Sequence, residues 1–167
     1  MASKQILGAS KIDRILLRMA YEIWEKNYDA KRIILAGITK KGPILAKMIE
    51  KKLKQVNCDK EIAQLEISIN KDKPTVESVV MSSEFTPNEN DVVIVVDDVL
   101  YTGSTMIHAV VPFIEQGFKK VQVAVLVFRD YLRFPIRADF VGISLASTTQ
   151  EHVEVSLEEN NSAAYLN

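Results

Sequence analysis

One short run, residues 92–105, constrains the fold of this chain more than any other feature. Five consecutive apolar β-forming residues, Val92 to Val96, lead into two adjacent carboxylates, Asp97 and Asp98. A loop of hydroxyl and glycine residues follows, and an apolar helical pattern begins at Met106. Because continuous apolar runs of this length are typical of strands covered on both faces, the run predicts a buried strand, a turn and a helix N-terminus.

The remaining apolar positions alternate between strand-like and helix-like spacing. Helices are expected from the N-cap Ser10, from Pro43 and from Met106, and strands are expected over residues 32–38, 62–69, 92–97, 121–127, 138–145 and 152–157. Strands that alternate with helices give a mostly parallel sheet with helices on both faces. We therefore expect one α/β domain over residues 1–167, with ligands bound at the carboxyl ends of its strands.

Two segments lack this regular pattern. Residues 70–90 are polar and broken by two prolines, with a short β-like stretch at 75–81, which predicts a mobile loop or hairpin. The polar tail, residues 158–167, is expected to fray. Within the third helix, Pro112 should produce a kink, and Gly117 suits its C-terminal end.

Composition excludes several classes of protein. The net charge of −1 gives no global basic field for nucleic acid or anionic membranes. No apolar run reaches the roughly 18 residues of a membrane span, and residues 1–8 lack the features of a signal peptide. The single cysteine, Cys58, excludes an internal disulfide and is expected to be a passive thiol, so a cytoplasmic location is expected.

The turn after the acidic pair has the residues of a phosphate site. Gly103 lets the backbone approach an anion closely, and the first N–H groups of the following helix face that anion unpaired. Hydroxyls of Thr102, Ser104 and Thr105 can add hydrogen bonds. A helix N-terminus contributes only about 0.3–1 kcal/mol toward a charge, so further cations are needed.

Asp97 and Asp98 suit a sugar better than a phosphate, because carboxylates repel phosphate groups. They can accept hydrogen bonds from ribose hydroxyls, or they can contact Mg²⁺, which prefers oxygen ligands and keeps several waters. The acidic pair and the turn together predict a ribose 5-phosphate site. The alternative is that Asp98 only caps the strand end and Asp97 faces solvent.

A second loop, Thr39-Lys40-Lys41-Gly42, also follows a predicted strand. Its two ammonium groups suit a second phosphate cluster such as a pyrophosphate, whereas in isolation the loop would be a solvated turn. Its place at the same sheet edge favours the phosphate site. His108 and His152 lack the spacing of zinc ligands, and neither a nucleophile elbow nor a Walker pattern is present.

These motifs resemble those of the type I phosphoribosyltransferases, in which an apolar strand, two acidic residues and a Thr-Gly-x-Thr loop follow one another. Over most of its length the chain is similar to the PyrR subfamily, which are bacterial pyrimidine-operon regulators and also uracil phosphoribosyltransferases. The segments that carry this similarity are the helix from Ile12 and residues 37–42, 97–103 and 135–142.

The resemblance implies a Rossmann-like fold, with a central, mostly parallel twisted sheet, helices on both faces and a small flexible hood over residues 70–86. It implies that a nucleobase, with uracil expected, displaces pyrophosphate from 5-phosphoribosyl 1-pyrophosphate (PRPP) in the presence of Mg²⁺. It also implies a homodimer.

The resemblance further implies the roles of individual residues. Asp97 and Asp98 would be catalytic: they would hold the ribose hydroxyls and reach the metal only through PRPP and water. The 5-phosphate would bind at 102–105 and the pyrophosphate at 39–42. The implied PRPP contacts are Thr39, Lys40, Lys41, Gly42, Lys71, Val99, Leu100, Tyr101, Thr102, Gly103, Ser104 and Thr105.

Two other functions stay open at this point. The chain departs from the family pattern at Lys41 and Ser104, where arginine is common, and at residues 128–133, near the expected base pocket. One alternative is an RNA-binding regulator that senses PRPP or a nucleotide with little catalysis, and its basic patch would comprise residues 4, 11, 14 and 18. The other is a generic α/β nucleotide-binding module.

Overall fold

The centre of the molecule is a six-stranded sheet in the order β4-β3-β2-β5-β6-β7. It is seen in a computed structural model of the chain, which describes residues 3–146, 151–158 and 161–167. Every neighbouring pair is parallel except β3 and β4. The mostly parallel sheet is therefore confirmed. The strands are β2 Arg32–Ile38, β3 Glu61–Ser68, β4 Val80–Met81, β5 Asp91–Leu100, β6 Val121–Arg129 and β7 Phe140–Leu145.

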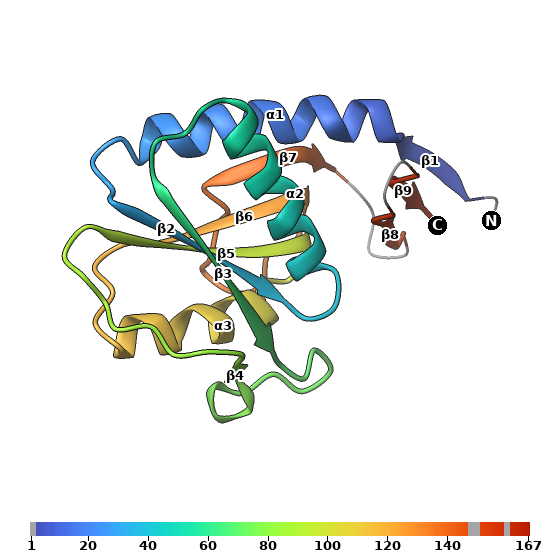
Figure 1. Cartoon of the computed structure of the whole chain (residues 1–167). Coiled ribbons are helices and arrows are strands. Elements are labelled where there is room, and N and C mark those ends of the chain that lie inside the picture. The colour runs from blue at the N-terminus through green and yellow to red at the C-terminus, as the bar shows by residue number, and fades with distance from the viewer. Residues whose placement is uncertain (1–2, 147–150, 159–160) are drawn as a thin grey trace.

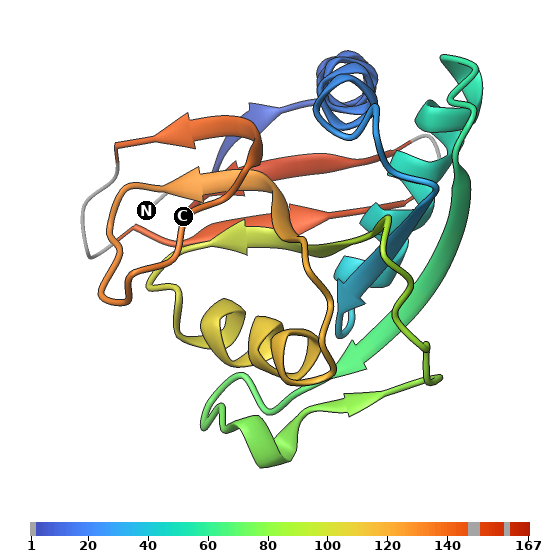
Figure 2. The same ribbon diagram turned by 90° about the vertical axis from the view of Figure 1, so that its left-hand side faces the viewer.

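Helices cover both faces of this sheet, as Figures 1 and 2 show. Helices α1 (Ala9–Lys26) and α2 (Gly42–Gln55) pack on one face, and α3 (Ser104–Glu115) packs on the other. Alternate residues of β5 enter the two cores: Val92, Ile94 and Val96 pack on the α1 and α2 side, and Val93 and Val95 on the α3 side. This double burial is the reason that the strand is apolar without a break.

The helix starts differ slightly from the expected positions. Helix α1 has Gly8 as its N-cap in place of Ser10, because the carbonyl of Gly8 accepts the first helical bonds, from the N–H groups of Lys11 and Ile12. Helix α3 begins at Ser104, before Met106, and contains Pro112. Gly117 follows the end of α3 with a φ of +90°, as expected of a C-terminal stop.

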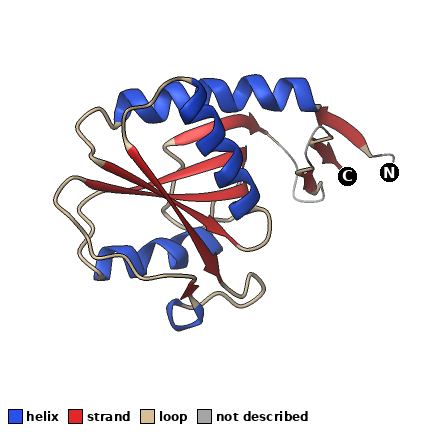
Figure 3. Ribbon diagram, in the orientation of Figure 1, coloured by secondary structure: helices blue, strands red, loops and turns tan. Residues whose placement is uncertain are grey.

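A second, smaller sheet joins the two ends of the chain (Figure 3). Strands β1 (Lys4–Leu7), β9 (Ala163–Leu166) and β8 (Val153–Ser156) pair antiparallel in the order β1-β9-β8. The expectation of a frayed tail is therefore wrong for residues 163–166. Ala163 and Ala164 are buried there, and the backbone of β9 is bonded on both sides. Strand β8 contacts strand β5 of the main sheet.

The segment 70–90 contains less strand than expected. Residues 76–78 form a 3-10 turn, η1 (Val76–Ser78), closed by reciprocal hydrogen bonds between Thr75 and Ser78. Only β4 pairs with the sheet, at the end of β3. No helix in the described part of the chain is long and apolar enough to cross a membrane.

Candidate active site

Strand β5 carries both acidic residues to the carboxyl-terminal edge of the sheet. Asp97 is 4% exposed and Asp98 is 8% exposed, so the alternative in which Asp97 faces solvent is wrong. The strand also continues past them to Leu100, because β6 pairs with it as far as Phe128. The two carboxylates therefore lie within a paired strand, and Asp98 is not a strand-end cap.

Each buried carboxylate pairs with a lysine from a different loop. The Nζ of Lys71, in the segment after β3, donates to both carboxylate oxygens of Asp97, at 3.0 and 2.9 Å. The Nζ of Lys41, in the loop after β2, lies 3.6 Å from Oδ2 of Asp98. The backbone N–H of Asp98 donates to Oδ1 of Asp97 at 2.9 Å. Four charged groups, two from strand β5 and one from each of two loops, thus lie together.

Burial dominates the electrostatics of Asp97. Loss of water and, to a smaller extent, the neighbouring Asp98 raise the pKa of this carboxyl, the charge of Lys71 lowers it, and the net result is a pKa raised to about 7. Near neutral pH this group is therefore poised between its neutral and ionised forms. A cation or a hydrogen-bond donor brought by a ligand would favour the ionised form.

The expected phosphate turn forms at the N-terminus of α3. Gly103 has a φ of +86°, and a Cβ at this position would lie 2.7 Å from Cγ2 of Ile136, so both the conformation and the space require glycine. The N–H of Ser104 donates to Oγ1 of Thr102 at 3.3 Å, which folds that hydroxyl into the turn. The N–H groups of Thr105 and of the residue after it have no acceptor within the helix.

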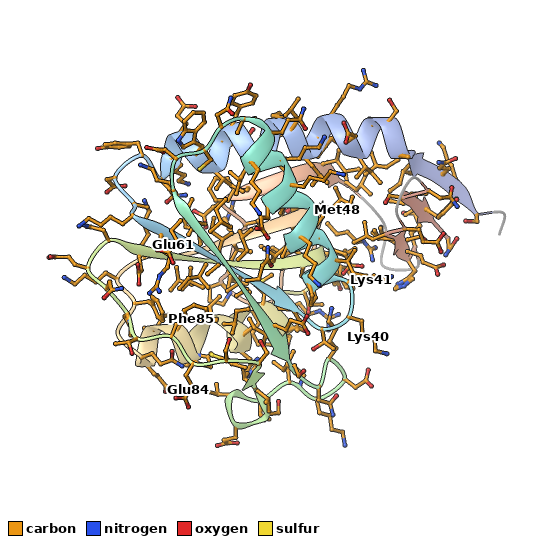
Figure 4. All side chains as sticks on the ribbon, in the orientation of Figure 1. Lys40, Lys41, Met48, Glu61, Glu84 and Phe85 are labelled. Atoms are coloured by element: carbon orange, nitrogen blue, oxygen red, sulfur yellow. The ribbon has the colours of Figure 1, made fainter. Side chains whose placement is uncertain are left out.

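The loop 39–42 divides into parts with different contacts. Oγ1 of Thr39 donates to the carbonyl of Ile67 at 2.6 Å, and this fastens the loop to the end of β3. Lys41 faces Asp98, whereas exposed Lys40 lines a separate cavity of about 210 Å³ beside α2. Figure 4 labels both lysines on this loop. The Thr39–Lys40 peptide bond is cis.

Gly42 brings the start of α2 against the acidic strand. A Cβ on this residue would lie 2.6 Å from the carbonyl oxygen of Val96, so only glycine allows this approach.

Leu100 is buried in the core on the α3 side, which turns its side chain away from a bound substrate. Of the residues expected to contact PRPP, Leu100 is therefore limited to contacts through its backbone.

A cavity of about 350 Å³ opens beside the acidic pair. Its lining residues come from both sheets: Lys41, Lys71, Asp98, Val99, Tyr101, Arg129, His152, Val153 and Glu154. Arg129 belongs to residues 128–133, which the sequence placed near the expected base pocket, and it does line this cavity. The sequence did not point to Glu154, because the pairing of β8 with β9 is what brings this residue to the site.

The donor set limits how a metal can bind. Among the described residues, no three His, Cys, Asp or Glu side chains cluster as a metal cage. Two adjacent carboxylates, Asp97 and Asp98, suit a Mg²⁺ ion that they would reach through substrate oxygens and waters. The residues present therefore fit an indirectly held metal and do not form an all-protein site.

Comparisons with known proteins agree on one family. The model of the phosphoribosyl transferase domain matches residues 2–160. The bifunctional protein pyrR of Enterococcus faecalis is 36% identical over 168 residues, covering 98% of this chain and 94% of that protein. The bifunctional protein PyrR of Alkaliphilus metalliredigens is 40% identical over 160 residues, covering 92% of this chain and 88% of that protein.

Solved structures show the same fold at low sequence identity. A hypoxanthine-guanine phosphoribosyltransferase from Bacillus anthracis aligns with a TM-score of 0.71 at 13% identity, over 99% of this chain and all of that chain. A hypoxanthine phosphoribosyltransferase from Trypanosoma cruzi, in complex with the product IMP, aligns with a TM-score of 0.68 at 15% identity, over 90% of this chain and 83% of that chain.

Proposed function

Because this chain belongs to the phosphoribosyltransferase family, and within it to the PyrR group, we propose that it transfers the ribose 5-phosphate of PRPP to uracil and releases pyrophosphate. The observation that carries this proposal is the meeting of buried Asp97 and Asp98 with Lys41, Lys71 and the turn 102–105 at one sheet edge. A sugar phosphate presents the groups that complement this arrangement.

The turn and the carboxylates would hold the two ends of the ribose phosphate. The free N–H groups of the first turn of α3, with the hydroxyls of Ser104 and Thr105, would bind the 5-phosphate. Asp97 and Asp98 would accept hydrogen bonds from the ribose hydroxyls. These contacts fix the anomeric carbon relative to the incoming base, so catalysis rests largely on positioning.

In the reaction, the bond from the anomeric carbon to the pyrophosphate oxygen breaks while a bond to a ring nitrogen of uracil forms, and the proton of that nitrogen passes to the departing pyrophosphate or to water. Positive charge develops on the ribose, and two carboxylates held beneath it would stabilise that charge in a site shielded from water. Mg²⁺, when bound, would neutralise charge on the departing pyrophosphate. Lys41 would supply a further positive charge on that side.

The two lysines would change partners when PRPP binds. In the ligand-free chain their ammonium groups neutralise the acidic pair, at 2.9 Å for Lys71 and 3.6 Å for Lys41. When ribose hydroxyls bind the carboxylates, the ammonium groups become available to the phosphates. Since Lys71 lies in the segment 70–86, this exchange would draw the proposed hood toward the substrate.

Pyrophosphate release with a panel of bases tests the proposal. The protein is incubated with PRPP, Mg²⁺ and one of uracil, cytosine, orotate, adenine, hypoxanthine or guanine. Release with uracil alone is the expected result. Release only with a purine would overturn the choice of base, and no release with any base would overturn the transferase activity itself.

A second candidate function, regulation through RNA, is favoured by the word bifunctional in the names of the relatives and by the exposed Lys11 and Arg14 on α1. Arg18 contributes less to such a patch, because its guanidinium binds Glu22 at 2.7 Å and the carbonyl of Gly142 at 2.6 Å. RNA retardation that weakens steeply between 50 and 200 mM salt would support this function.

The homodimer implied by the family resemblance and the cytoplasmic location expected from the sequence also belong to this proposal. Light scattering of the purified chain tests the first: a mass of twice 18.8 kDa is expected, and a mass of 18.8 kDa would contradict it.

A further inference from the structure

Two arginines and two tyrosines form a continuous stack beside the phosphate turn. The Cζ atom of Arg129 lies 4.1 Å from the ring centroid of Tyr101. The rings of Tyr101 and Tyr131 are stacked, with centroids 5.2 Å apart and planes inclined by 21°. Cζ of Arg133 lies 5.2 Å from the Tyr131 centroid, and Nη2 of Arg133 donates to the Tyr131 hydroxyl at 3.0 Å. Each ring of the stacked tyrosine pair is therefore also in contact with an arginine.

This stack joins the phosphate turn to a different part of the chain. Tyr101 immediately precedes the turn, whereas the other three members lie at the end of β6 and just beyond it. The backbone makes the same connection, because the N–H groups of Arg133 and Phe134 both donate to the carbonyl of Thr102, at 2.9 and 3.1 Å. Residues 131–136 therefore hold the turn by side chains and by backbone.

The members of the stack differ in their access to a substrate. Arg129 and Tyr101 line the cavity beside the acidic pair. Tyr131 is half-buried and is not among the residues that line this cavity. The stack gives Tyr131 a route to a bound sugar phosphate through the ring of Tyr101 and the turn that follows it.

We propose that Tyr131 is a positioning residue that holds the phosphate turn ready for the 5-phosphate, an inference that rests on the proposed function. The turn binds through backbone N–H groups, which are effective only when they already point at the phosphate. Without the ring of Tyr131, Tyr101 loses one of its two stacking partners, and the turn must be ordered when the substrate binds. That ordering weakens binding.

The predicted effect falls on binding and not on the chemical step. The 5-phosphate is remote from the anomeric carbon, and its contacts do not change as the transition state forms. Loss of an interaction of equal strength in the ground and transition states raises KM and leaves kcat unchanged. A variant that merely reduced the amount of folded protein would instead lower the apparent kcat and leave KM unchanged.

The test compares Tyr131→Ala and Tyr131→Phe with Tyr28→Ala, a control at a tyrosine that is 77% exposed. Three quantities are measured: kcat and KM for PRPP, calorimetric Kd for ribose 5-phosphate without base or metal, and the thermal midpoint. For Tyr131→Ala we expect KM and Kd to rise about tenfold, near the upper end of what one aromatic stack contributes, with kcat within about twofold of the unaltered protein. Tyr131→Phe, which keeps the ring, and Tyr28→Ala should both resemble the unaltered protein.

Several results would overturn the positioning role. Unchanged KM and Kd in Tyr131→Ala would show that the turn needs no support from the stack, and an equal fall in kcat would place the residue in the chemical step. Failure of Tyr131→Phe to restore binding would assign the effect to the hydroxyl. If Tyr131→Ala does not fold, Tyr131→Leu keeps apolar bulk without an aromatic ring and tests the same point.

The experiment also separates this inference from the proposed function. If the unaltered protein releases no pyrophosphate from PRPP with any base, the proposed function fails. If it releases pyrophosphate, and Tyr131→Ala has the same KM for PRPP and the same Kd for ribose 5-phosphate, only the positioning role fails.

Discussion

Replacing Asp97 with asparagine should make the folded chain more stable at alkaline pH while removing its activity. The cause is the raised pKa of the buried carboxyl, about 7 in the folded chain against an ordinary value of 3.8. Between these two values the folded state holds a proton that the unfolded state has released, so folding takes up a proton. The stabilisation associated with this group is fully present below about pH 4 and is lost as the pH rises through about 7.

The size of the effect follows from the shift. A difference of about 3 pKa units, at about 1.4 kcal/mol per unit, corresponds to at most about 4 kcal/mol over the whole window. About two of those three units fall between pH 5 and pH 8, so over that range the unfolding free energy should fall by about 3 kcal/mol. The pKa of about 7 already includes the attraction of Lys71, which lowers the pKa of Asp97. An asparagine does not titrate, so the Asp97→Asn chain should lack this loss.

Urea unfolding at pH 5 and pH 8, followed by the fluorescence of the sole tryptophan, Trp24, measures this difference. The unaltered chain should lose about 3 kcal/mol more unfolding free energy between the two pH values than Asp97→Asn does. Asp72→Asn, at an exposed position in the neighbouring loop, is the matched control and should follow the unaltered chain. Equal losses in the unaltered chain and in Asp97→Asn would refute the reasoning.

Three further predictions test other parts of the site. Asp98→Asn should lower pyrophosphate release by about 100-fold or more, because one acceptor for the ribose hydroxyls loses its charge; unchanged steady-state kinetics would remove its assigned role. Gly103→Ala should lower the unfolding free energy by about 1–2 kcal/mol in urea, since alanine is strained at a φ of +86° and its Cβ would meet Ile136; an unchanged midpoint would contradict this. Burial raises the pKa of the Cys58 thiol, so its alkylation at pH 7 should be slower than that of free cysteine, and a faster rate would argue for an activated thiolate.

The parts of the fold that sequence predicts well are those fixed by local constraints. The bounds of β2 are as expected, because all its residues after Arg32 are buried and the apolar run ends where the strand ends. The turn before α3 was also predictable, since Gly103 is required both by its left-handed conformation and by the nearby Ile136 side chain; its phosphate role stays a prediction. At such positions the local backbone conformation allows only one residue type, so the sequence pattern predicts the structure without knowledge of distant contacts.

The parts that were missed depend on pairing between distant segments. Strand β9 is only four residues long and contains two alanines, which favour helices more than strands. Its stability comes from lying between β1 and β8, at opposite ends of the sequence. The same pairing brings Glu154 to the cavity. The extension of β5 through the acidic pair likewise depends on β6, which no local signal around Asp98 reveals.

The pairing of Asp97 and Asp98 with lysines supports the proposed function, because it shows how two adjacent carboxylates could bind a substrate that also carries phosphates. In the ligand-free chain, Lys71 and Lys41 hold Asp97 and Asp98, so the buried charges are compensated. A bare phosphate could take the lysines only by leaving both carboxylates without partners. A bare sugar could take the carboxylates only by leaving both ammonium groups without theirs. A phosphorylated pentose, the ligand of the proposed function, would provide hydroxyls and phosphates at once, so that each buried carboxylate and each half-exposed lysine would exchange one partner for another. The ion pairs would therefore add to the contacts of the turn 102–105 in favouring such a molecule.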